Sequence, residues 1–186
     1  MIIVIEGPNR VGKSTQIANL KNYYESKGMR VHVIHYEHIH LDPTRTYTPE
    51  AMKDMATVRY DDMLKLANEF AKDPMSVIIF DRAHLGEHVY GPKYRDYSGE
   101  YVFELEKKYP EFLQNAYEFV FIDDAENLLA REDGLSPTQG LEQKKYELSS
   151  FIDAFVRSNV HHKALIRLSA IGDADAVWKH IKEMIV

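Results

Sequence analysis

The 186-residue sequence predicts an α/β fold in which a parallel sheet lies between two layers of helices. Short apolar runs alternate along the chain with longer stretches of helical periodicity, which is the order expected of a doubly wound fold. The short runs are apolar on both faces, as strands covered on both sides are. The apolar fraction of 45% and the charged fraction of 28% are those of an ordinary globular domain.

Five apolar segments are predicted to form the strands of this sheet. They are Ile2–Ile5, Val31–Tyr36, Ser76–Phe80, Tyr117–Ile122 and Ala164–Leu168. Turn-forming residues or predicted helices separate them. Because no linker, repeat or low-complexity segment interrupts the pattern, we expect a single domain over residues 1–186.

Helices are predicted between the strands and after the last one. Their ranges are Lys13–Lys27, Pro49–Phe70, Ala125–Arg131, Pro137–Arg157 and Asp175–Ile185. Gly28 is expected to end the first helix in a left-handed conformation, which glycine adopts without steric cost. The fourth helix is expected to begin with Ser136 as N-cap, Pro137 at its first position and Gln139 closing a capping box.

Composition and charge exclude several classes of protein. The chain has no cysteine, which rules out disulfides, thiolate metal sites and cysteine nucleophiles. A net charge of −6 argues against a protein that coats nucleic acid. No run of about 18 apolar residues and no signal-peptide pattern is present, so we expect a soluble cytoplasmic protein without a membrane partner. Any phosphate must therefore bind at a concentrated site.

A phosphate-binding loop is the most specific motif of the sequence. Gly7–Ser14 matches G-x-x-x-x-G-K-[ST] between a predicted strand and a predicted helix, the context that the motif requires. Lys13 is expected to reach the β- and γ-phosphates of ATP, and the Ser14 hydroxyl to bind Mg²⁺. The predicted ATP-binding residues are Gly7, Pro8, Asn9, Arg10, Val11, Gly12, Lys13, Ser14 and Thr15. The expected fold is thus of the P-loop NTPase type.

Arg10 lies inside this loop, where its guanidinium can reach over the phosphoryl group that is transferred. Phosphoryl transfer depends on positioning and charge neutralisation, and an arginine of the same chain can supply both. A solvated surface arginine is the alternative. We expect Arg10 to be catalytic, together with Lys13.

Asp81 and Arg82 directly follow the third predicted strand. Ligands of open parallel sheets bind beyond the carboxyl ends of the strands, so both side chains should face the bound phosphates. Asp81 is a candidate Mg²⁺ ligand and Arg82 a candidate clamp for an acceptor phosphate. A purely structural ion pair between them is the alternative.

Arg59 interrupts an apolar stripe on the second predicted helix. The stripe consists of Met52, Met55, Arg59, Met63, Leu66 and Phe70, and its face should turn inward. A buried arginine needs a partner. Asp62 can provide it, or Arg59 can contact a ligand.

Two further clusters allow more than one interpretation. Tyr90, Tyr94 and Tyr97 can stack on a base while Arg95 meets phosphate, or all four can pack inside the protein. His35, His38 and His40 have a spacing that can suit a metal, although the segment also reads as strand and loop.

Residues 131–140 are predicted to form a mobile lid, since Gly134 and Ser136 lie between a strand region and the capped helix. A lid excludes water, so that the phosphoryl group reaches its acceptor. Arg131 is the one arginine that this segment can bring to the transferred group.

These residues together resemble the thymidylate kinases and related deoxynucleoside monophosphate kinases. Ile5-Glu6-Gly7 through Ser14-Thr15-Gln16 is similar to the family's loop of the type that carries its catalytic arginine within the loop, with Arg10 at that position. Asp81-Arg82 matches the family's Asp-Arg, Arg131 its lid arginine and Arg59 its base-reading arginine. Residues 81–92 look more like bacteriophage-encoded members. The resemblance also implies a homodimer.

The sequence departs from the family pattern at two places. Asn9 stands where an aspartate near the acceptor's sugar and magnesium is usual. Tyr36-Glu37-His38 replaces the usual Thr-Arg-Glu-Pro after the second strand.

We therefore expect an Mg- and ATP-dependent kinase that phosphorylates a deoxynucleoside monophosphate, foremost dTMP to dTDP. The acceptor would bind to Arg59, Asp81, Arg82, Tyr90 and Asn9. A kinase of broader specificity that also accepts dGMP is one alternative. A deoxynucleoside kinase is another, and would need a general base such as Glu6, Glu37 or Asp81. A non-catalytic ATP-binding module is the third.

Overall fold

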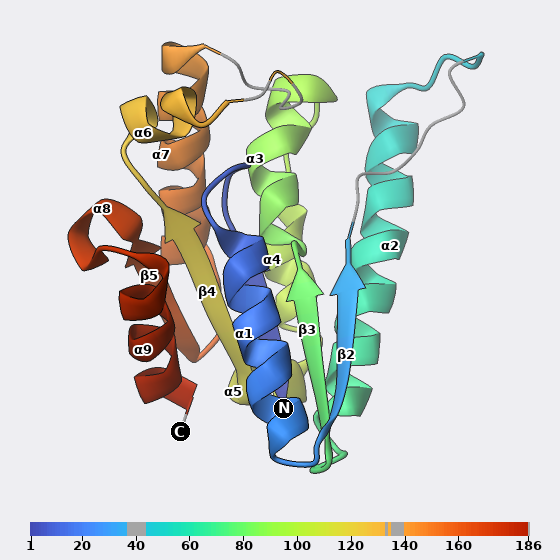
Figure 1. Cartoon of the computed structure of the whole chain (residues 1–186). Coiled ribbons are helices and arrows are strands. Elements are labelled where there is room, and N and C mark those ends of the chain that lie inside the picture. Colours follow the sequence, from blue (N-terminus) through green and yellow to red (C-terminus); the bar gives the residue numbers. More distant parts are fainter. Residues whose placement is uncertain (37–43, 133, 135–139, 186) are drawn as a thin grey trace.

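The computed structural model describes residues 1–36, 44–132, 134 and 140–185, and its central feature is one parallel sheet (Figure 1). The strands are β1 (Ile2–Glu6), β2 (Arg30–His35), β3 (Ser76–Asp81), β4 (Ala116–Ile122) and β5 (His162–Arg167). Their order across the sheet is β2-β3-β1-β4-β5, and each neighbouring pair is parallel. The predicted fold class is confirmed.

Helices cover both faces of this sheet. They are α1 (Lys13–Ser26), α2 (Pro49–Phe70), α3 (Leu85–Tyr94), α4 (Tyr101–Glu106), α5 (Pro110–Asn115), α6 (Ala125–Ala130), α7 (Leu141–Arg157), α8 (Leu168–Ile171) and α9 (Ala174–Ile185). Alternate residues of β1 serve opposite faces: Ile3 and Ile5 pack in the core with α1, and Ile2 and Val4 in the core with α2. Figure 1 shows α1 in front of the sheet and α7 behind it.

Local signals define two of the helix ends well. Gly28 follows α1 with φ +76°, the predicted left-handed conformation. Helix α2 has the predicted bounds, because Thr48 caps it and Pro49 occupies its first position. The Thr48 Oγ1 accepts a hydrogen bond of 3.2 Å from the Ala51 amide.

Helix α7 begins later than predicted. Gly140 has an extended backbone and serves as its N-cap, so the helix starts at Leu141 rather than at Pro137. The Gln143 Oε1 accepts the Gly140 amide at 3.0 Å, which supplies this end with its own cap. The predicted cap at Ser136–Gln139 lies outside the described residues.

Residues 85–115 form three helices that the sequence pattern did not predict. Helix α3 contains Gly86, Gly91 and Pro92, which are poor helix formers, so its composition resembles a loop. Helices α4 and α5 have six residues each, too few to show a period.

The predicted inward stripe of α2 is wrong at two positions. Met55 and Leu66 are 41% and 39% exposed. The buried face instead consists of Ala56, Tyr60, Met63, Leu64 and Ala67. This face includes two small alanines, so the packed stripe is displaced from the one that the large methionines suggested.

No described helix is both long and apolar enough to cross a membrane.

Candidate functional site

Three central strands end beside one another and are followed by the predicted site residues. Ile5 of β1 pairs with Asp81 of β3, and Glu6 of β1 pairs with Val120 of β4. The order of the strands reverses at β1. The connection after β1 leads to β2 on one side of the sheet, and the connection after β3 leads to β4 on the other side. Ligands of parallel sheets bind in the crevice at such a point.

The glycines of the phosphate loop have conformations that other residues rarely adopt. Gly7 has φ +131°, and a Cβ there would lie 2.3 Å from the Phe121 carbonyl oxygen. Gly12 has φ +86° and leads directly into α1. The loop thus ends at a helix N-terminus, where backbone N–H groups and the helix dipole favour phosphate.

Lys13 is buried at the mouth of the loop. Its Nζ donates to the carbonyl oxygens of Gly7 at 2.8 Å and Pro8 at 2.6 Å. Burial, followed by the nearby positive charge of Arg82, lowers the pKa of Lys13 to about 7, although Asp81 opposes both. The Lys13 amine is therefore held where a bound phosphate would favour its protonated, positively charged form.

Arg82 reaches from the end of β3 to the phosphate loop. Its Nη2 donates to the Asn9 Oδ1, and its backbone has φ +67°. The Arg82 amide donates to the Ile5 carbonyl at 2.9 Å, which fixes this turn against β1. Arg10 also has a left-handed backbone, with φ +65°, and its side chain is exposed.

Asp81 contacts a histidine and not its neighbour Arg82. The Asp81 Oδ2 lies 2.8 Å from the His35 Nδ1 at the end of β2. Asp81 and Arg82 therefore have different partners, contrary to a simple ion pair between them. Of the predicted histidine cluster, His38 and His40 lie outside the described residues.

Two of the predicted metal ligands suit Mg²⁺ by their chemistry. The Ser14 hydroxyl is exposed in the first turn of α1, and Asp81 supplies a carboxylate at the neighbouring strand end. Oxygen donors of this kind are what Mg²⁺ prefers, usually in combination with phosphate oxygens and water.

Arg59 lies against an aromatic ring beside a surface cavity. Its guanidinium is 4.7 Å from the centre of the Tyr36 ring, and the Tyr36 hydroxyl donates to the Arg59 carbonyl at 2.9 Å. Tyr36, Arg59 and Asp62 line the cavity, which has a volume of about 350 Å³. The half-buried Arg59 does not belong to the buried face of α2.

Most of the predicted aromatic cluster near α3 packs inside the protein. The Tyr90 hydroxyl donates to Glu147 of α7 and the Tyr97 hydroxyl to Glu87. Arg95 pairs with the same Glu87 at 2.6 Å. The packing alternative thus describes Tyr90, Tyr97 and Arg95, and Tyr90 is only 5% exposed, whereas the Tyr94 side chain is 45% exposed.

Arg131 is tied to the end of β4. It forms an ion pair of 2.8 Å with the buried Asp123. Its neighbour Glu132 pairs at 2.6 Å with the buried Lys144 of α7. Residues 133 and 135–139 of the predicted lid lie outside the described residues.

The charged residues that α7 contributes to the interior were not predicted from the sequence. Lys144 and Glu147 are buried together with Leu148, Phe151 and Ala154. These positions follow the helical spacing of an inward face, so the pattern itself carried the signal. Charged side chains are mostly exposed in proteins, so their charge argued against a buried position.

Glu6, the last residue of β1, binds the turn that follows β3. It is buried, and its Oε1 accepts hydrogen bonds from the amides of Ala83 at 2.9 Å and Gly86 at 3.2 Å. Burial raises the pKa of Glu6, although the charge of His84 lowers it.

Comparisons with known proteins support the fold. The sequence matches no protein-family profile and no curated protein. The structure is similar to that of YorR from Bacillus subtilis, solved in complex with phosphorylated GDP, with a TM-score of 0.65, 17% identity, and 100% of this chain and 95% of that chain covered. It is also similar to thymidylate kinase from Candida albicans, with a TM-score of 0.64, 14% identity, and 99% and 90% covered. At these identities the likeness shows a shared fold.

Proposed function

We propose that this protein transfers the γ-phosphoryl group of Mg-ATP to a nucleoside monophosphate, foremost dTMP. The observation that carries the proposal is the contact between Arg82 and Asn9, which holds a cation from the end of β3 against the phosphate loop after β1. A donor phosphate in the loop and an acceptor phosphate at Arg82 would then be neighbours. Positioning and charge neutralisation are most of what phosphoryl transfer requires.

The donor side has the groups to bind ATP. Loop amides and Lys13 would bind its phosphates, and Ser14 with Asp81 would hold Mg²⁺, which would neutralise phosphate charge. The exposed Arg10 can turn toward the transferred group, and Arg131 stands at the end of the adjacent strand β4. Both arginines would stabilise the negative charge that develops in the transition state.

The acceptor side supports a base site between α2 and β2. The Arg59 guanidinium on the Tyr36 ring offers a rigid donor fork beside the 350 Å³ cavity. Asn9 would contact the acceptor near its sugar, and Tyr90 would form the wall that Glu147 supports.

A monophosphate acceptor fits the described residues better than a nucleoside does. A phosphate oxygen is already deprotonated, whereas a hydroxyl acceptor needs a base within hydrogen-bond reach. Glu6 is 1% exposed and its Oε1 is occupied by two amides, so it is shielded from such a hydroxyl. Glu37 lies outside the described residues, and Asp81, the third candidate base, contacts His35 at 2.8 Å and is assigned to Mg²⁺ in this proposal.

The complex of YorR with phosphorylated GDP favours testing guanine nucleotides as well. The experiment is a panel of ribo- and deoxynucleoside monophosphates and free nucleosides, each assayed with Mg-ATP for production of ADP. Turnover with dTMP supports the proposal, and turnover with several deoxynucleoside monophosphates supports a broader kinase. Turnover with nucleosides alone, or ATP binding without turnover on any acceptor, refutes it.

A further inference from the structure

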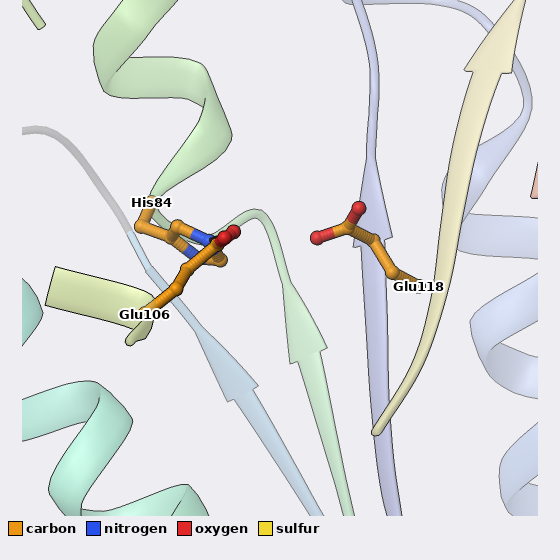
Figure 2. A group of neighbouring side chains, drawn as sticks. All are labelled: His84, Glu106 and Glu118. Carbon is orange, nitrogen blue, oxygen red and sulfur yellow. Dashed lines mark hydrogen bonds and ion pairs between the residues drawn. The ribbon is translucent and has the colours of Figure 1, made fainter. Parts of the chain in front are cut away.

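Three ionisable side chains from separate elements meet in the core below the candidate site. They are His84 in the turn after β3, Glu106 at the end of α4 and Glu118 within β4, and all three are fully buried (Figure 2). One ligating atom from each lies within 4.8 Å of those of the others. None of them belongs to the phosphate loop or to the proposed acceptor site.

Within this cluster His84 and Glu106 form an ion pair in which both Glu106 oxygens are hydrogen-bonded, whereas the His84 Nδ1 is buried without a hydrogen-bond partner among the described residues. The Glu106 Oε1 lies 2.6 Å from the His84 Nε2 and accepts the Ser158 hydroxyl at 3.0 Å. Its Oε2 accepts the Asn159 amide at 2.7 Å and the Asn159 Nδ2 at 2.9 Å. Burial opposes charge on both groups, but these bonds outweigh it, lowering the pKa of Glu106 and raising that of His84.

Glu118 has a different environment. Both of its oxygens are buried and accept no hydrogen bond, and the nearby Ser158 hydroxyl, which would favour the carboxylate, donates to Glu106 instead. Lys163, its register partner on β5, donates instead to carbonyls at the end of α7. Of the other charges nearby, His84 favours the carboxylate, whereas Glu106 and Glu6 of β1 disfavour it. An unpaired buried charge costs several kcal/mol, so the neutral acid is the stable form.

A metal ion explains the cluster less well than a proton does. Each Glu106 oxygen already accepts two hydrogen bonds, and the His84 Nε2 is directed at Glu106, so a cation would have to displace several of these bonds. A proton on Glu118 neutralises that carboxyl group, and a proton on His84 supplies the positive charge that offsets Glu106. No hydrogen bond of the cluster has to be displaced.

The cluster is connected to Arg82 through a single intervening residue, Ala83, which precedes His84. A non-glycine residue at positive φ costs roughly 1 kcal/mol and persists only where its surroundings hold it. On one side Arg82 is held by the hydrogen bond that its backbone amide donates to the Ile5 carbonyl. On the other side Glu6 binds the Ala83 amide, and the His84 imidazole is locked to Glu106.

We propose that the His84–Glu106 pair, kept intact by a neutral Glu118, positions Arg82 for the acceptor phosphate. This inference rests on the proposed function, in which Arg82 binds that phosphate. Loss of the pair would let the turn relax and move the guanidinium away from Asn9. Ionisation of Glu118 would have a similar effect, because it places an uncompensated carboxylate beside Glu106.

The first test compares Glu106→Gln with Glu104→Gln, an exposed position of the same helix. Affinity for dTMP is measured by calorimetry without ATP, and the KM for ATP in a separate assay. Glu106→Gln should raise the dTMP Kd at least ~10-fold and change the ATP KM by less than ~2-fold, since misplacement of a binding group affects only its own ligand. A folded Glu106→Gln protein with wild-type dTMP affinity would overturn the proposal.

The second test uses Glu118→Gln, which matches the shape of the neutral acid and should fold. Wild-type affinity for dTMP should fall from pH 7 to pH 9 as Glu118 loses its proton, because burial places its pKa at about 8. The variant should lack that part of the pH dependence, while any contribution from Lys13 stays the same in both proteins. Identical pH profiles would overturn the proposal.

Two measurements separate this inference from the proposed function. The infrared carbonyl band of a neutral carboxylic acid should be present at pH 6 and should lose intensity in Glu118→Gln, whatever the substrate. If the wild-type protein binds one equivalent of metal and Glu118→Gln does not, the assignment of Glu118 as a neutral acid is overturned. A wild-type protein that binds dTMP but does not phosphorylate it would refute the proposed function and leave the binding tests valid.

Discussion

The donor and acceptor sides of the candidate site are built in opposite ways. Most of the donor side is one continuous segment, Gly7–Thr15, which follows β1 and runs into the first turn of α1. The acceptor side combines Tyr36 after β2, Arg59 of α2 and Arg82 after β3. A contiguous site depends on local backbone geometry, whereas an assembled site depends on the packing that brings its parts together.

Each side nevertheless contains one arginine with a left-handed backbone, Arg10 at φ +65° and Arg82 at φ +67°. The Arg82 turn is held by contacts from β1 and the core cluster. The exposed Arg10 lies between the two glycines of its loop. We therefore expect substitutions on the donor side to act on catalysis, and substitutions on the acceptor side to act mainly on binding.

The largest effect is expected at the two donor-side cations. Lys13→Ala and Arg10→Ala should each lower kcat at least ~10³-fold, the scale of arginine fingers in phosphoryl transfer. Steady-state assays with saturating dTMP and ATP measure this. Lys21→Ala, on an exposed part of α1, is the control and should keep wild-type kcat. An Arg10→Ala enzyme with normal turnover would remove the catalytic role of Arg10.

The next test concerns the backbone of the phosphate loop, on which the donor side depends. Gly7→Ala should destabilise the fold by about 2–4 kcal/mol, because a Cβ at φ +131° meets the Phe121 carbonyl oxygen. Gly28→Ala is the matched control, since φ is +76° but no atom lies within 4 Å of its Cβ, and it should cost only about 1 kcal/mol. Urea unfolding measures both. Equal losses would show that strain and not contact controls the loop.

The same contrast explains what sequence could predict. The phosphate loop and the strand ends follow from local spacing, so their positions were predictable from residues such as Gly7 and Gly12. Helix α3 was hidden by Gly91 and Pro92, and the buried Lys144 by its charge. Glu118 reads as one polar residue in an apolar strand. Its environment depends on His84 and Glu106, which only the fold brings beside it.

On the acceptor side, Arg59→Ala should raise the KM for dTMP about 10-fold, the typical loss for one charged hydrogen-bonding side chain. Its kcat should change less than 3-fold and its melting temperature little, since Arg59 lies off the buried face of α2. Lys65→Ala, exposed on the same helix, is the control. A change in stability without a change in KM or base preference would favour a packing role.

The smallest effect concerns a single proton at Lys13. Free protein above pH 7 should hold this side chain largely uncharged, because burial and Arg82 lower its pKa to about 7. ATP phosphates favour the ammonium, so ATP binding at pH 8 should take up close to one proton, and at pH 6 close to none.

Calorimetry in buffers of different ionisation enthalpy measures this uptake directly. By linkage, uptake of one proton makes the ATP Kd rise about 10-fold per pH unit above pH 8, the opposite of the sign expected if binding released a proton. Lys13→Met should abolish the uptake even though it also weakens binding. ATP binding at pH 8 without proton uptake would mean that Lys13 is already charged in the free protein, and that the carbonyls of Gly7 and Pro8 stabilise its ammonium more than burial disfavours it.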